Sequence, residues 1–352
     1  MKARVFATFS LLVAAFALSP VQAQSQSMTK LIVQNGAAAP ALDTARLDVA
    51  KELGFFADEK LDVEIRYGRG AGLAAQLTTN NQVDVSVITY EPIIIGHDKG
   101  LNGKIFYQTT SSVIYYIAVP EDGPIKAAAD LKGKKIGVVG LGSAAVTVSK
   151  SILRSAGLAP TDATFLPVGF GDQAANALRS HQVDALALWD GSYAPMISGG
   201  MKLRFIKHPQ LADGGNAGLY ASDATIAKRA DDLKRFARAF TKATIFMKAN
   251  PEAAIKIFWK ANPGSKRSGD DAEAMRRARI ELDFIAKTFD APQGYGHIQE
   301  GLFKKYIEIL HQEGEVADTP PVSKFVTQSL LGLSDQVDAA AVQALAKDWK
   351  EK

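Results

Sequence analysis

Two glycine-rich turns carry the residue types best suited to hold a small charged ligand. In the first, Gly68-Arg69-Gly70, the glycines allow close approach of a ligand to the backbone, and Arg69 can hold a carboxylate or sulfonate through two parallel hydrogen bonds. The second turn, at 140–143, opens a predicted helix whose free N–H groups at Gly142, Ser143 and Ala144 favour an anion. A solvent-exposed arginine and an ordinary helix cap are the alternatives. Together the turns predict an anion-binding site.

Aromatic and acidic pairs end two apolar runs of the chain. Tyr90-Glu91 closes the first run and Trp189-Asp190 closes the second. An aromatic ring at such a place can stack on a planar ligand, although core packing is the usual role of a single aromatic residue. A buried carboxylate needs a partner, which is either a turn amide or Arg69, or else an amine or ring N–H of the ligand. Asp43 is expected to cap the first helix.

Residue patterns for catalysis, metals and nucleotides are weak. The five histidines have no metal-ligand spacing, there is no Gly-x-Ser-x-Gly turn, and there is no cysteine. Gly140-x-Gly142-x-x-Ala145 imitates a dinucleotide fingerprint, but the next expected strand, at 164–168, does not end in the acid that would bind a ribose. We therefore expect no catalytic residue, no metal and no cofactor.

The two aromatic–acidic pairs belong to an internal repeat. The segment from Gly68 through Gln82-Val83-Asp84 recurs from Gly169 through Gln182-Val183-Asp184, with the glycines 101 positions apart and the triplets 100 apart. Each copy predicts a strand, a glycine turn, a helix and a second strand. Open α/β sheets bind ligands at the carboxyl ends of their strands. Two such units predict two similar lobes that face each other across a cleft.

Composition and the N-terminus suggest an exported globular protein. The chain has 352 residues, 47% hydrophobic and 22% charged. Lys2 and Arg4, an apolar run at 5–18 and Val21-Gln22-Ala23 predict a signal peptide over residues 1–23. The formal net charge of +4 falls by two without Lys2 and Arg4, so no nucleic-acid partner is expected. Without cysteine no lipid anchor forms, and we expect a monomer in the periplasm.

The expected elements divide the remaining chain into two parts. Strands and helices alternate up to residue 222, after which helices are expected at 223–249, 251–261, 271–289, 297–313, 322–332 and 337–350. The strand expected at 114–119 is assigned to lobe one. The predicted lobe one covers 24–119 and 221–352, and lobe two covers 120–220. Two antiparallel crossings, near 119–123 and 220–222, would form a hinge.

These motifs resemble a known family. Five motifs, in chain order, resemble the periplasmic solute-binding proteins of nitrate, sulfonate and taurine ABC importers, a group that includes binders of thiamine pyrimidine precursors. They are Leu53-Gly54-Phe55-Phe56, Leu61-Asp62-Val63-Glu64, Gln82-Val83-Asp84, Asp130-Leu131-Lys132-Gly133 and Gln182-Val183-Asp184. The resemblance covers roughly residues 30–260. Gly191 departs from it, because many relatives have proline there, and the C-terminal tail aligns poorly.

The resemblance implies a two-lobe α/β periplasmic binding protein fold, type II-like, with two mixed sheets flanked by helices. It implies a substrate-binding component that delivers a small organic anion, a sulfonate or carboxylate, to an ABC permease. The alternatives are an amine-bearing ligand such as taurine or an aminopyrimidine, and an exported enzyme, a regulator's effector domain or a ligand sensor on the same fold. The candidate ligand-binding residues are Ala41, Leu42, Asp43, Arg69, Gly70, Tyr90, Glu91, Tyr115, Gly142, Ser143, Ala144, Trp189, Asp190 and Tyr193.

Overall fold

The computed structural model describes residues 27–68, 70–211, 214–267, 269–290, 292–331 and 336–351. The expected signal peptide and Arg69 lie outside these ranges. Within them, no helix is both long enough and apolar enough to cross a bilayer.

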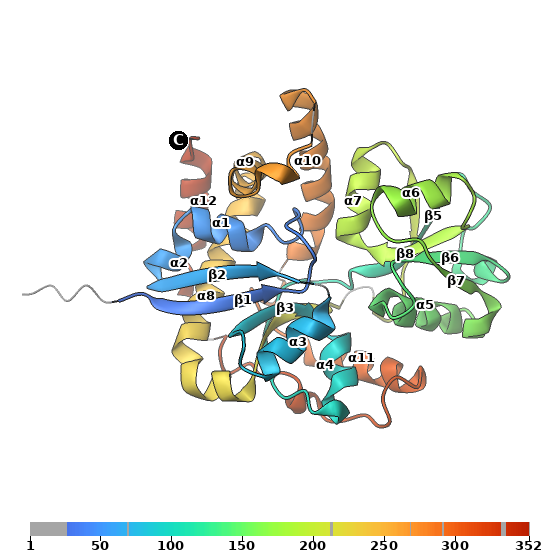
Figure 1. Ribbon diagram of the computed structural model, residues 1–352, viewed down its shortest axis with the longest axis horizontal. Helices are drawn as coiled ribbons and strands as arrows, with labels where there is room; N and C mark the ends of the chain where they lie inside the picture. Colours follow the sequence, from blue (N-terminus) through green and yellow to red (C-terminus); the bar gives the residue numbers. More distant parts are fainter. Residues whose placement is uncertain are drawn as a thin grey trace, which may run out of the picture.

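Two five-stranded mixed sheets form the two lobes, as expected (Figure 1). The sheet of lobe one has the order β2-β1-β3-β10-β4, with β1 (Thr29–Asn35), β2 (Leu61–Tyr67), β3 (Val85–Thr89), β4 (Lys104–Gln108) and β10 (Ala217–Ala221). The sheet of lobe two has the order β7-β6-β8-β5-β9, with β5 (Tyr115–Pro120), β6 (Lys135–Val138), β7 (Thr164–Pro167), β8 (Ala185–Trp189) and β9 (Leu203–Ile206). In each sheet the first three strands are parallel and the fourth is antiparallel to them.

Helices cover both sheets (Figure 1). Lobe one carries α1 (Arg46–Glu52), α2 (Phe55–Asp58), α3 (Ala71–Thr79), α4 (Glu91–Gly96), α8 (Asp223–Ala249), α9 (Pro251–Ala261) and α12 (Ala339–Asp348). Lobe two carries α5 (Ala144–Ser155), α6 (Asp172–Arg179) and α7 (Asp190–Ser198). Short 3₁₀ turns lie at His97–Lys99, Ala128–Leu131, Pro160–Asp162, Pro263–Ser265, Ala286–Phe289 and Val322–Lys324. The prediction of a helix at 322–332 is correct only for the turn Val322–Lys324. It is wrong for residues 325–331, which form no helix.

The repeat seen in the sequence is a repeat of structure. β2-α3-β3 and β7-α6-β8 are equivalent units, and their Gln-Val-Asp triplets play the same role. The Asp84 carboxylate accepts the Ile32 N–H of β1 at 2.7 Å, and the Asp184 carboxylate accepts the Lys135 N–H of β6 at 2.8 Å. Each aspartate therefore fixes the register of its strand against the central neighbour, and the repeated triplet is structural.

The chain passes between the lobes earlier than the sequence suggested. β5 pairs with β8 and β9, so the assignment of this strand to lobe one is wrong. The outward crossing is the segment 109–114, and the described residues of the return crossing are 207–211 and 214–216. Asn216 ties the two crossings together, because its side-chain oxygen accepts the Ile114 N–H at 3.1 Å. Gly215 allows their close approach, since a Cβ there would lie 1.8 Å from the Thr110 carbonyl oxygen.

Two C-terminal helices, α10 (Asp271–Ile285) and α11 (Glu300–Gln312), lie between the lobes on opposite sides (Figure 1). α10 packs on α7 of lobe two, where Ser198 donates to Glu281 at 2.7 Å, and it also packs on α9 of lobe one. At the end of α11, Glu313 pairs with Arg154 of α5 at 3.2 Å. The C-terminal region therefore contacts both lobes.

Candidate ligand-binding site

Polar side chains gather where the strands of both sheets end at the contact between the lobes. Asn35 ends β1, Thr89 ends β3, and Trp189 ends β8. Eight buried side-chain atoms of the described residues have no hydrogen-bond partner, and seven lie at these strand ends or in the loops and helix starts that follow them: Asn35 Nδ2, Asp43 Oδ1, Thr89 Oγ1, Glu91 Oε2, Thr109 Oγ1, Thr110 Oγ1 and Ser192 Oγ. Native proteins pair nearly all such groups, so this concentration makes the contact between the lobes the candidate ligand-binding site.

Asp43 and Asp190 face each other across the lobe contact. The indole Nε1 of Trp189 in lobe two donates to Asp43 Oδ2 at 3.1 Å, and Asp43 Oδ1 is buried without a partner. Asp190 is 4% exposed and accepts only the Gly191 N–H, at 2.8 Å. Burial raises the pKa of Asp43, and burial together with the Asp43 charge raises the pKa of Asp190 to about 7. The Asp190 carboxyl therefore keeps its proton to a higher pH than an exposed aspartate does.

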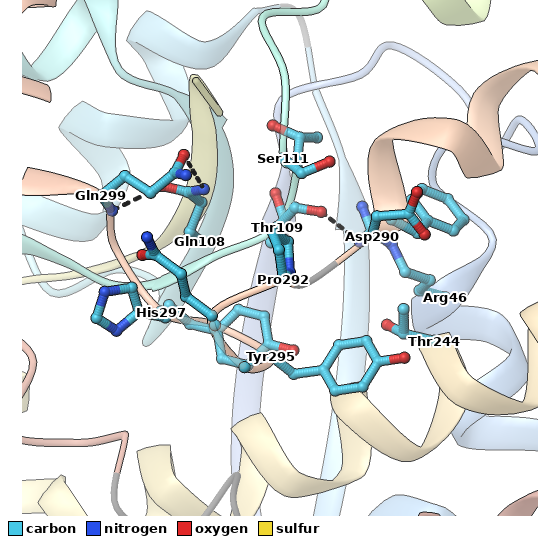
Figure 2. Close-up of a pocket in the computed structure, with 16 residues that line it drawn as sticks. Arg46, Gln108, Thr109, Ser111, Thr244, Asp290, Pro292, Tyr295, His297 and Gln299 are labelled. Atoms are coloured by element: carbon cyan, nitrogen blue, oxygen red, sulfur yellow. Dashed lines mark hydrogen bonds between the residues drawn. The ribbon is translucent and has the colours of Figure 1, made fainter. Parts of the chain in front are cut away.

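Arg46 supplies the buried positive charge at this contact. Its guanidinium lies between the rings of Phe240 and Phe289, 4.8 and 4.2 Å from their centroids, and donates to the Thr109 carbonyl at 2.7 Å (Figure 2). A cavity of about 30 Å³ beside it has room for about one water molecule. Burial lowers the pKa of Arg46 to about 10, so the group stays charged at neutral pH. It forms no salt bridge with a described residue.

Glu91 connects the site to the hinge and to α11. It is 1% exposed, and its Oε1 accepts hydrogen bonds from Tyr306 of α11 and from Asn216 of the return crossing. Burial raises its pKa. Burial is the main cause that raises the pKa of the Tyr115 hydroxyl, and the charges of Glu91, Asp190 and Asp43 add to it. Glu91 and Asp190 occupy equivalent places in the repeat but have different partners.

Two of the expected stacking residues lie in the cores of the lobes instead. The Tyr90 ring packs against Phe303, with 4.6 Å between centroids, and its hydroxyl donates to Gln108 at 3.1 Å. Tyr193 is completely buried, and its hydroxyl accepts the Leu188 N–H and lies 2.9 Å from the Tyr116 carbonyl. For these two residues the core reading is correct. Trp189 is partly exposed beside Phe170, so its ring stays available to a ligand.

The remaining described residues of the expected site belong to the loop before α1 and to the turns that precede α3 and α5. Ala41 and Leu42 line a cavity of about 580 Å³ between the loop before α1 and the helices α9 and α10. Ser143 caps α5 by accepting the Ala145 N–H at 3.3 Å, which is the ordinary role weighed for it. Gly70, exposed, has φ +96° and begins α3. Gly142 and Ala144 flank Ser143 on the lobe-two turn, and neither cavity is lined by these turns.

Sequence reasoning missed Arg46, Thr89, Ser192 and Asn216. Arg46 had a signal, since it lies one helical turn after Asp43 in an otherwise apolar stripe. Thr89 is the last residue of β3, Ser192 lies in the first turn of α7 and Asn216 lies in the return crossing. Only the fold brings these small polar residues to the site. In the described part of the chain, no group of three or more His, Asp or Glu side chains could hold a metal.

Three of the solved structures that resemble this chain cover most of its length. The periplasmic aliphatic sulphonate-binding protein SsuA from Escherichia coli superposes with TM-score 0.67 at 18% identity, over 86% of this chain and 93% of that one. The periplasmic nitrate-binding protein NrtA from Synechocystis gives 0.67 at 16% identity, over 90% and 91%. DszB in complex with biphenyl-2-sulfinic acid gives 0.56 at 14%, over 88% and 99%. At these identities the likeness shows the fold, which is that of periplasmic binding proteins.

The family follows from the sequence itself. The family model described as NMT1/THI5 like matches residues 42–254, more than half of the chain, so the protein belongs to the NMT1/THI5-like family. No curated protein sequence matches it. The matched range contains both copies of the repeat, and also Asp43, Arg46, Glu91 and Asp190 of the lobe contact.

Proposed function

We propose that this protein is the substrate-binding component of an ABC importer, exported to the periplasm, that captures one small molecule between its lobes. A single observation carries the proposal: both lobes bring buried polar groups without partners to their mutual contact. A molecule that pairs with these groups contacts both lobes only when they are closed. It therefore stabilises the closed form, which is the form a permease can distinguish.

Binding rather than catalysis accounts for the residues at the lobe contact. The described site holds carboxyls, hydroxyls and one arginine, but no serine, histidine or lysine arranged as nucleophile and base. A micromolar affinity requires about 8 kcal/mol. Charge-assisted hydrogen bonds in a site closed to water, together with stacking on Trp189, supply energies of this order. An enzyme on the same fold is the competing reading, and turnover of a bound compound by the purified protein would support it.

The sequence leaves two ligand classes for this site. A small organic anion, a sulfonate or carboxylate, would use Arg69 and the turn amides at Gly142 and Ser143. An amine-bearing ligand would use the carboxyls at the lobe contact. The first class depends on a residue outside the described ranges, and the second on side chains whose positions are known.

Uptake and binding measured together test the importer role. We expect that a compound which raises the thermal midpoint of the purified protein is taken up by the native cells, and that deleting the gene abolishes this uptake. The protein should also become more compact in X-ray scattering when the compound is added. Normal uptake in the deletion strain, with unchanged scattering, would refute the importer role.

A further inference from the structure

Arg46 is a buried cation with few partners. It is 6% exposed, and its guanidinium donates one hydrogen bond to a described residue, from Nη1 to the Thr109 carbonyl at 2.7 Å. The carboxyls of Asp43 and Asp190 act on its charge, but no described residue forms a salt bridge with it. A guanidinium carries several N–H donors, and buried charges are normally paired. This group therefore has donors left for a further acceptor.

The cavity beside Arg46 is separate from the contact where Asp43 and Asp190 meet (Figure 2). Its lining comes from α1, from the end of β4 and the start of the outward crossing, from Thr244 of α8, and from residues 289, 290, 292–297 and 299. No described residue of lobe two lines it. The cavity measures about 30 Å³, which is room for one water-sized species and not for an organic molecule.

Two threonine hydroxyls at the start of the outward crossing are unused donors at this cavity. Thr109 and Thr110 are 5% and 8% exposed, both line the cavity, and the Oγ1 atom of each is buried without a hydrogen-bond partner among the described residues. The next residue, Ser111, uses its hydroxyl to donate to the Thr288 carbonyl at 3.2 Å. A buried hydroxyl without a partner is costly, and it can donate to an anion. One cation and two hydroxyls form a donor set for an anion.

The other ionisable side chains at the cavity do not replace that anion. Asp290 is exposed, and its carboxylate pairs with Lys248 at 2.5 Å. His297 is half-buried and lies on the side of the cavity away from Arg46 (Figure 2). Tyr107, which is buried, bonds through its hydroxyl to Thr241 at 2.9 Å. The charge next to the two free hydroxyls is therefore positive.

We propose that this cavity binds a monatomic halide, such as chloride, between the Arg46 guanidinium and the hydroxyls of Thr109 and Thr110. The halide neutralises the buried cation and holds the first residues of the outward crossing against α1. Gly215 of the return crossing approaches the Thr110 carbonyl closely, so the ion also steadies the place where the two crossings meet. The site does not depend on the importer role, because its lining includes no described residue of lobe two.

The dependence of the thermal midpoint on chloride tests the site. The full chain is unfolded in mixtures of sodium chloride and sodium gluconate at constant ionic strength, so that general screening stays the same. We expect the midpoint to rise with the chloride concentration, as binding to the folded chain alone requires. Bromide should act in the same way, and anomalous diffraction from crystals grown in bromide should place the ion beside the Arg46 guanidinium. Equal midpoints in the two salts, or no bromide beside Arg46, would overturn the proposal.

Two threonine variants test the assignment of the donors. Thr109→Val and Thr110→Val each remove one hydroxyl and keep the shape of the side chain. Each should weaken chloride binding at least tenfold, and neither should lower the midpoint in gluconate, because the hydroxyl that it removes has no partner. Thr225→Val is the control, since this buried threonine of α8 lies outside the cavity and its hydroxyl bonds to Ser222 at 2.9 Å.

The control should separate a lost hydrogen bond from a lost ion. Thr225→Val should lower the midpoint in both salts and keep the full rise with chloride. Replacing Arg46 is less informative, because it would also remove the ring contacts of its guanidinium with Phe240 and Phe289. A rise with chloride that is unchanged in both Thr109→Val and Thr110→Val would contradict the proposed site.

Discussion

Replacing Asp190 by asparagine should make the free protein more stable at alkaline pH. The carboxyl of Asp190 is 4% exposed, and burial beside Asp43 raises its pKa from 3.8 to about 7. Below pH 3.8 both the folded and the unfolded chain keep this proton, so the group costs nothing. Between 3.8 and 7 only the folded chain keeps it, and the free energy of unfolding falls as pH rises. Above pH 7 the loss is complete.

The size of this loss follows from the pKa difference. About three pH units at 1.36 kcal/mol each give about 4 kcal/mol at pH 8. This is an upper limit, because separation of the lobes lets water reach the carboxylates without unfolding either sheet. Asparagine has the same shape and cannot ionise. We therefore expect Asp190→Asn to be more stable than the natural chain by about 1–4 kcal/mol at pH 8, and equal to it near pH 4.

Urea unfolding followed by circular dichroism from pH 4 to pH 8 measures the effect, with midpoints and slopes compared at each pH. Asp130→Asn is a control of opposite sign. Asp130 accepts the N–H groups of Lys126 and Ala127 at 2.8 and 3.0 Å, and these bonds lower its pKa. Its loss should lower stability at neutral pH and matter less in acid. An Asp190→Asn variant that is no more stable at pH 8, or whose gain does not shrink in acid, would refute the reasoning.

Two further predictions concern the hinge and α11. Gly215→Ala should destabilise the protein by more than about 2 kcal/mol, because the new Cβ would lie 1.8 Å from the backbone oxygen of Thr110. Gly72→Ala is the control in the same urea experiment. A Cβ at residue 72 meets no atom within 4 Å, so this change should be neutral or slightly stabilising. Tyr306→Phe should cost about 1–3 kcal/mol, since it removes a donor from the buried Glu91 carboxyl, and Tyr306→Phe combined with Glu91→Gln should cost less than the two single changes together. Additive losses in this double-mutant cycle would show that the bond does not contribute.

The repeat allowed the fold to be predicted because its signals are local. Strand, glycine turn and helix follow from alternation and from turn residues, and both copies formed as expected. The crossings could not be located in this way. β5 is an apolar strand like those of lobe one, and only its pairing with β8 shows that it belongs to lobe two. The helix expected at 322–332 failed for a related reason, because residues 325 and 326 pack in the core without being helical.

The sequence predicted which strands and helices form the candidate site, but not which side chains meet there. Asp43 and Trp189 lie 146 positions apart, and their hydrogen bond depends on how the lobes meet, which no local pattern specifies. Gly191 was visible as a departure from the family's usual proline, but its reason is a carboxyl from the other lobe. The two glycine-rich turns and Arg69 predicted a site that binds an anion. The structure places the buried carboxyls of Asp43 and Asp190 near enough for the charge of Asp43 to raise the pKa of Asp190, which changes the electrostatics of the site.

The two copies of the repeat use the same acidic position for different purposes. Glu91 accepts bonds from Asn216 of the return crossing and from Tyr306 of α11, so it joins the site to both elements that must move when the lobes separate. Asp190 accepts one bond from its own helix and is otherwise left to face Asp43. A ligand that pairs with Asp190 therefore pairs with a carboxyl that accepts no hydrogen bond from the described residues of the crossings or from α11.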